Sequence, residues 1–104
     1  MSELETALTA TGLKFAHFGW SKAPSGDYGV FAEDGANDLI AGNVHTERII
    51  EGTVDYFTRD AGLACKALIE AALNGCGCAW YLNSIQFEDD TGYIHLEWVF
   101  QTQG

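Results

Sequence analysis

The segment from His45 to Arg59, HTERIIEGTVDYFTR, constrains the fold more than any other part of the chain. Its side chains alternate with a period of two: Ile50 and Val54 lie on a mostly apolar face, and the opposite face is mostly acidic. This alternation is typical of an antiparallel strand that packs on one side and meets water on the other. It stops just before Asp60, which can cap a helix. The segment therefore predicts a long strand that leads directly into a helix.

The remaining elements follow from the same reading of periodicity. Residues 3–11 have apolar side chains at helical spacing and are followed by Gly12, a typical helix stop. Residues 61–73 are expected to form a second helix, and we expect strands over residues 13–20, 28–33, 80–87 and 93–101 and a polar loop over residues 34–44. The expected apolar stripe of the second helix consists of Leu63, Ala67, Leu68, Ala71 and Ala72.

The last two expected strands form a hairpin around Gly92. A bulge near Asn83-Ser84 would place four apolar side chains of the first strand on one face, and the second strand alternates cleanly. The expected inward residues are Trp80, Leu82, Ile85 and Phe87 on one strand and Ile94, Leu96, Trp98 and Phe100 on the other.

The element order α-β-β-β-α-β-β predicts the fold class α+β. We expect a four- or five-stranded, mostly antiparallel sheet with both helices packed on one face. The length of 104 residues suits a single domain that spans residues 1–104.

The charge balance limits the classes of partner. Fifteen acidic and five basic residues give a formal net charge of −10, which disfavours binding to nucleic-acid phosphates or to an anionic membrane surface. A basic protein partner, or mimicry of nucleic acid, remains compatible with this charge. No apolar run approaches the ~20 residues that a membrane span needs. The acidic start of the chain differs from a signal peptide, so we expect synthesis in the cytoplasm.

The sequence contains no motif that predicts a catalytic, cofactor or metal site. Cysteines 76 and 78 are one residue apart, whereas zinc sites use pairs two to four residues apart, so a tight turn is favoured. A calcium loop around Asp34 lacks the required order and the closing glutamate. Convergence of the three histidines is also disfavoured. The residues weighed were Cys65, Cys76, Cys78, Asp34, Asn37, Asp38, His17, His45 and His95.

Five stretches, taken in order, resemble a known family. They read ATGLKFAHFGW, YGVFAED, VDYFTRD, CKALIEAALNG and YIHLEWVFQ. This pattern resembles the small tail-completion, tail-terminator or head-tail joining proteins of long-tailed phages and prophages of Gram-positive bacteria. The chain departs from that pattern at residues 39–42, where LIAG stands in place of an aromatic residue before an Ala-Asp pair.

The resemblance implies a structural protein and no enzyme. Its relatives are α+β proteins that form a hexameric ring, which caps the tail tube and docks the head. The implied partners are further copies of the chain, the tail tube protein and a head-completion or connector protein. The implied location is the host cytoplasm during assembly and then the neck of the virion. As subunit contacts we expect Trp20, Leu39, Ile40 and Arg59.

Two other functions remain open at this point. An acidic inhibitor or DNA mimic would present carboxylates in rows against a basic enzyme, and Glu47, Glu51 and Asp55 share one strand face. A small-molecule-binding domain or enzyme would use aromatic residues as a pocket, for which the candidates are Trp20, Trp80 and Tyr81.

Overall fold

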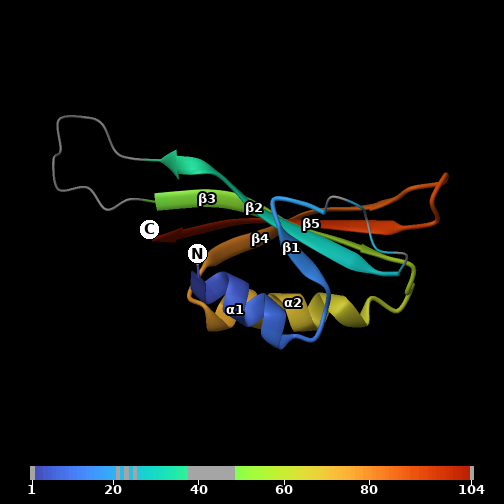
Figure 1. The fold of residues 1–104 in the computed structure, drawn as a ribbon, viewed down its shortest axis with the longest axis horizontal. Helices are drawn as coiled ribbons and strands as arrows, with labels where there is room; N and C mark the ends of the chain where they lie inside the picture. The colour runs from blue at the N-terminus through green and yellow to red at the C-terminus, as the bar shows by residue number, and fades with distance from the viewer. Residues whose placement is uncertain (1, 21, 23, 25, 38–48, 104) are drawn as a thin grey trace, which may run out of the picture.

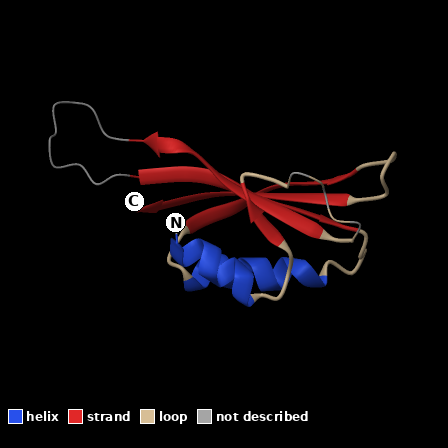
Figure 2. Ribbon diagram, viewed as in Figure 1, coloured by secondary structure: helices blue, strands red, loops and turns tan. Residues whose placement is uncertain are grey.

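The computed structural model describes residues 2–20, 22, 24, 26–37 and 49–103. These residues form two helices and a five-stranded mixed sheet, which confirms the α+β expectation. Both helices lie on the same side of the sheet (Figure 2). The elements are α1 (Ser2–Ala10), β1 (Phe15–His17), β2 (Tyr28–Asn37), β3 (Ile49–Thr58), α2 (Ala64–Gly75), β4 (Ala79–Phe87) and β5 (Ile94–Gln103).

The strands are arranged in the order β1-β2-β3-β5-β4 (Figure 1). β1 pairs with β2 in parallel, and every other neighbouring pair is antiparallel. β1 and β4 therefore lie at the two edges of the sheet, and β3 lies in the middle. No helix within the described residues is long and apolar enough to cross a membrane.

The alternation expected for the central strand is confirmed. Val54 and Tyr56 are buried against the helices, and the alternate residues Asp55 and Phe57 are half-buried on the face that carries no helix. β5 repeats the pattern, because its inward residues Leu96, Trp98 and Phe100 are fully buried. These three side chains form the centre of the hydrophobic core.

The bulge expected in β4 is also confirmed. The register of β4 against β5 shifts between Leu82 and Ser84. Before the shift Leu82 lies opposite Trp98, and after it Ile85 lies opposite Leu96. The shift keeps Leu82 and Ile85 on the same face of the sheet, as expected.

The first helix forms as expected, but over Ser2–Ala10 in place of residues 3–11. Leu4 and Leu8 are buried in the core. Gly12 ends the segment with φ +82°, a left-handed conformation that glycine adopts without strain.

The inward face predicted for α2 is only partly right: Ala72 is buried and Leu63 packs against the core, but Ala67, Leu68 and Ala71 are exposed. Its buried residues are Cys65, Ile69, Ala72 and Leu73, whereas Leu68 is exposed. The helix has apolar residues on almost every side, so its sequence does not define one stripe. Its rotation about the helix axis is fixed by contacts with the sheet, one of which is the hydrogen bond that Glu70 accepts from the buried Trp98 indole.

Several boundaries also differ from expectation. β2 continues to Asn37 through a register shift between Glu33 and Gly35, so the first part of the expected loop is strand. β1 is shorter than expected because Phe18 takes φ +69°.

The start of α2 also differs from the expected start at residue 61. The helix begins at Ala64, and Leu63 with φ 53° holds the N-cap position. The carboxylate of Asp60 still accepts hydrogen bonds from the backbone N–H groups of Gly62 and Ala64. Asp60 therefore supports the helix start from outside the cap position.

Candidate interaction surfaces

One edge of the sheet displays two large apolar side chains beside unpaired acids. Ile85 and Phe87 on β4 are 45% and 64% exposed. They lie on the side of the sheet that carries the helices, but the β4–β5 hairpin projects beyond the first residues of α2 (Figure 1). The turn continues with Glu88, Asp89 and Asp90, of which Asp89 and Asp90 are exposed and have no ion-pair partner within the described ranges. We call residues 85–90 the β4 edge patch.

The opposite edge displays aromatic side chains beside unpaired bases. Phe18 and Trp20 follow β1 and are 67% and 37% exposed. Lys14 precedes β1, and Lys22 follows Trp20; both are exposed. Neither lysine has an ion-pair partner among the residues that the structure describes. We call Lys14, Phe18, Trp20 and Lys22 the β1 edge patch.

The aromatic rings of the β1 edge patch are held in place by contacts within the chain. The Phe18 ring stacks on His17 with centroids 4.2 Å apart, and His17 stacks on Phe31 at 4.8 Å. The Trp20 indole N–H donates a hydrogen bond to the Gly29 carbonyl at 3.0 Å. These contacts restrict the rings before any partner arrives, which lowers the entropy lost on binding.

Phe18 adopts an unfavourable backbone conformation. Its φ of +69° lies in the left-handed region, which disfavours residues with a Cβ by roughly 1–2 kcal/mol. Its backbone N–H donates to the Phe31 carbonyl at 2.8 Å, so the turn is fixed to β2. The fold thus maintains a disfavoured turn that leaves an apolar ring in solvent, and disfavoured backbone conformations of this kind cluster at functional positions.

His17 links this stack to an acidic residue on β2. It pairs with Glu33, and that hydrogen bond is the main cause that lowers the pKa of the Glu33 carboxyl below its usual value. The pair therefore orients the imidazole ring that supports Phe18.

The helix-free face of the sheet carries an aromatic cluster whose rings pack against one another and against Arg59 of the same chain. Phe57 stacks on Tyr28 and on His95, with centroids 4.8 and 4.3 Å away. Tyr93 packs edge-on to Phe57, and the Arg59 guanidinium lies 4.1 Å from the centre of the Tyr93 ring. Burial is the main cause that raises the pKa of Tyr28.

The same contacts account for Arg59, which we expected to be a subunit contact. Its guanidinium donates hydrogen bonds to the Thr91 carbonyl and covers Tyr93. Arg59 thus joins the end of β3 to the β4–β5 turn within one chain.

Carboxylates on the helix-free face are also paired within the chain. Asp55 and Glu97 lie directly opposite one another on β3 and β5. The imidazole of His95 lies 2.8 Å from Asp55, and the Asn83 amide donates to Glu97 at 3.1 Å. Two opposed carboxylates would otherwise destabilise the strand pair.

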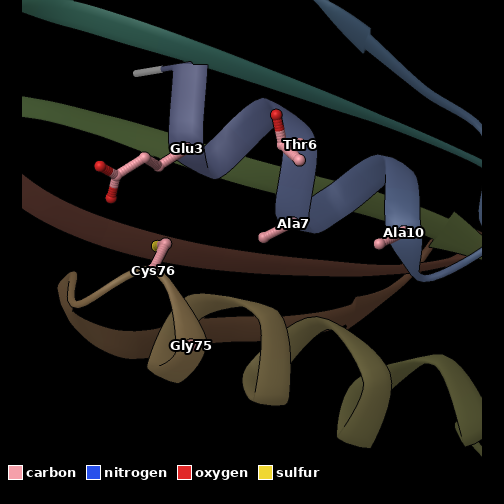
Figure 3. A pocket seen from close by; sticks show the side chains of 6 residues that line it. All are labelled: Glu3, Thr6, Ala7, Ala10, Gly75 and Cys76. Carbon is pink, nitrogen blue, oxygen red and sulfur yellow. The ribbon is translucent and has the colours of Figure 1, made fainter.

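A hollow of about 350 Å³ opens between α1 and the end of α2. Figure 3 shows Ala7 and Ala10 of α1 facing Gly75 and Cys76 across it, with the Glu3 carboxylate at one end. Half of its six lining residues are alanine or glycine, and Thr6 is among the others. The Cys76 thiol is engaged with the Cys78 sulfur, 2.7 Å away, and with the Leu73 carbonyl. No group of three potential metal ligands occurs within the described residues.

The other predicted site residues do not come together. Trp80 lies on the inner face and donates to the Asn74 side chain, Tyr81 lies on the outer face, and Trp20 lies at the far edge. The predicted aromatic pocket is therefore wrong. His17 is on β1, at an edge, and His95 is on the outer face of β5, while His45, Glu47, Leu39 and Ile40 lie outside the described residues.

The sequence reading missed Phe18, Ile85 and Phe87 as surface features. The sequence did contain a signal for them, since the charged residues within four positions of each are all of one sign. No known family model matches the chain, and no curated protein matches it.

Proposed function

We propose that this chain is a structural ring protein, of the tail-terminator or head-tail joining kind, that assembles at the end of a phage tail tube. The observation that carries the proposal is the pair of unlike surfaces at opposite edges of one sheet. Each edge exposes large apolar side chains, and the flanking charge is acidic at one edge and basic at the other. Unlike surfaces that bind one another give head-to-tail contacts, and such contacts close into rings when the rotation between copies permits.

The resemblance of five sequence stretches to tail-completion proteins supports the same function. It supplies the expected number of six copies, and it supplies the partners, a tail tube protein on one side and a head-completion or connector protein on the other. The net charge of −10 suits a channel through which DNA slides without adhering, because like charges repel. The proposed location is the host cytoplasm during assembly and then the neck of the virion.

The acidic-inhibitor alternative receives less support. A mimic of nucleic acid needs carboxylates that are free to meet a basic partner. Asp55 and Glu97, the opposed pair at the middle of the helix-free face, are instead hydrogen-bonded to His95 and Asn83.

Native mass spectrometry and sedimentation velocity of the purified chain test the proposal. We expect closed oligomers, six copies being the expected number, and binding of those oligomers to the end of tail tubes in electron micrographs. A chain that stays monomeric across the micromolar range, or that binds a basic enzyme as a monomer, would overturn the ring function.

A further inference from the structure

We propose that the β4 edge patch of one copy docks against the β1 edge patch of the next copy. This inference rests on the proposed ring function and deepens it by assigning the two surfaces that meet. The occupant of each patch is thus the opposite patch of a second copy of this chain.

The apolar side chains supply the first reason. Ile85 and Phe87 on one edge and Phe18 on the other are large, exposed and held by the strands or by stacking. Removing such surface from water is the main driving force for association.

Charge complementarity supplies the second reason. Four basic residues fall within the described ranges, and two of them are engaged in the chain: Lys66 pairs with Glu70, and Arg59 covers Tyr93. The other two, Lys14 and Lys22, have no ion-pair partner within those ranges, and both belong to the β1 edge patch. The unpaired acids Asp89 and Asp90 belong to the β4 edge patch. Opposite charges on the two patches favour this pairing and disfavour contact between two identical patches.

Strand direction supplies the third reason. β1 runs parallel to β2, and three antiparallel pairings then lead across the sheet to β4, so β1 and β4 run in opposite directions. A second copy related by rotation about an axis parallel to the strands keeps these directions. Its β1 would lie antiparallel to β4 of the first copy, which is the arrangement that edge strands use when they pair between chains.

A mixing experiment tests the inference with two variants. The first, Phe18→Asn with Lys22→Glu, disables the β1 edge patch; asparagine tolerates the left-handed backbone at position 18. The second, Ile85→Thr with Phe87→Thr, disables the β4 edge patch and retains residues that favour strands. Leu68→Gln is the matched control, because Leu68 is 44% exposed on α2 and belongs to neither patch. Circular dichroism and thermal unfolding establish that each variant is folded.

We expect each patch variant alone to be monomeric at concentrations where the wild type and Leu68→Gln assemble, with at least a tenfold weaker association. A one-to-one mixture of the two variants should form a heterodimer and nothing larger, because only one competent pair of patches remains. Adding Asp89→Lys to a Lys22→Glu chain should restore part of the lost association.

Three results would overturn the inference, and they are distinguishable. Variants that assemble as the wild type does would place the contact elsewhere and leave the ring function intact. A single variant that forms dimers by itself would show that a patch binds its own kind. A wild-type chain that never assembles would remove both the inference and the proposed function.

Discussion

The indole N–H of Trp98 donates a hydrogen bond to Oε2 of Glu70 at a distance of 3.1 Å, which ties the centre of β5 to α2. Trp98 is fully buried, so this N–H has no access to water. Lys66, one turn earlier on the helix, holds the same carboxylate from its exposed side.

Replacing Glu70 with alanine should therefore destabilise the fold. The buried indole donor would lose its acceptor, a loss that costs about 1–3 kcal/mol in the free energy of unfolding. Glu70→Gln retains an acceptor oxygen and should lose less, and Lys66→Ala should change stability by at most ~1 kcal/mol because its ion pair is partly exposed. Urea denaturation measures all three, and equal losses for Glu70→Ala and Glu70→Gln would contradict the assigned role.

Gly52 lies at a position in the core where there is no room for an added side-chain atom. A Cβ at this position would lie 2.2 Å from the Ala32 carbonyl oxygen and 2.7 Å from the Phe100 ring. We expect Gly52→Ala to destabilise the chain by about 1–3 kcal/mol or more, because backbone of β2 would have to move.

Gly75 provides the matched control for that substitution. It ends α2, and a Cβ there would meet nothing within 4 Å. Gly75→Ala should leave thermal unfolding unchanged or raise its midpoint slightly, since alanine favours the helix. A similar loss at both positions would show that contact at Gly52 is not the cause.

The three thiols should differ in reactivity. Burial, and then the hydrogen bond between Cys78 and Cys76, raises the pKa of Cys78 from 9.0 to about 12, and burial also raises the pKa of Cys65. A raised pKa keeps the thiol protonated, and the thiolate is the reactive form. Between pH 7 and 9 we expect iodoacetamide to label Cys76 first and the other two slowly, as followed by mass spectrometry.

The same thiols should lose their protection when the chain unfolds. In denaturant all three should be labelled at similar rates. The folded chain holds the Cys78 proton more tightly than the unfolded chain does. The stability that Cys78 contributes is therefore fully present below pH 9 and is lost as the pH rises toward 12. Labelling of native Cys78 as fast as Cys76 would show that the thiol is not shielded.

Assembly should depend on salt in a defined direction. Each copy carries a formal charge of −10, and at 10 mM salt the screening length of ~30 Å lets whole copies repel one another. Near 150 mM salt the length falls to ~8 Å, so adjacent opposite charges dominate. Sedimentation should show weaker assembly at 10 mM than at 150 mM, and assembly favoured by low salt would count against the ring.

Strand periodicity made most of the sheet predictable. Where one face is buried and the other is wet, as at Val54 and Asp55, a period of two defines both the strand and its inward side. The bulge in β4 was predictable for the same reason, because only a shift near Asn83 places Leu82 and Ile85 on one face.

The rotation of the helices and the backbone turns were harder to predict from the sequence. In α2 the apolar residues surround the axis, and the inward choice of Ile69 over Leu68 depends on partners that are distant in sequence. The surface at Phe18 depends on a left-handed backbone, which the sequence does not favour at phenylalanine. The extension of β2 to Asn37 arises from pairing with β3 and overrides the turn-forming residues of that segment.

The bulge between Leu82 and Ser84 determines on which side of the sheet Ile85 and Phe87 lie, and so which surface would be presented to another copy. Because neighbouring strand residues point to opposite sides, a β4 of the same length without this bulge would turn Ile85 and Phe87 onto the helix-free surface. Deleting the one extra residue would instead leave regular alternation, with Leu82, Ile85 and Phe87 still on the helix side. The side of the sheet on which these two apolar side chains lie therefore depends on one residue being accommodated out of register.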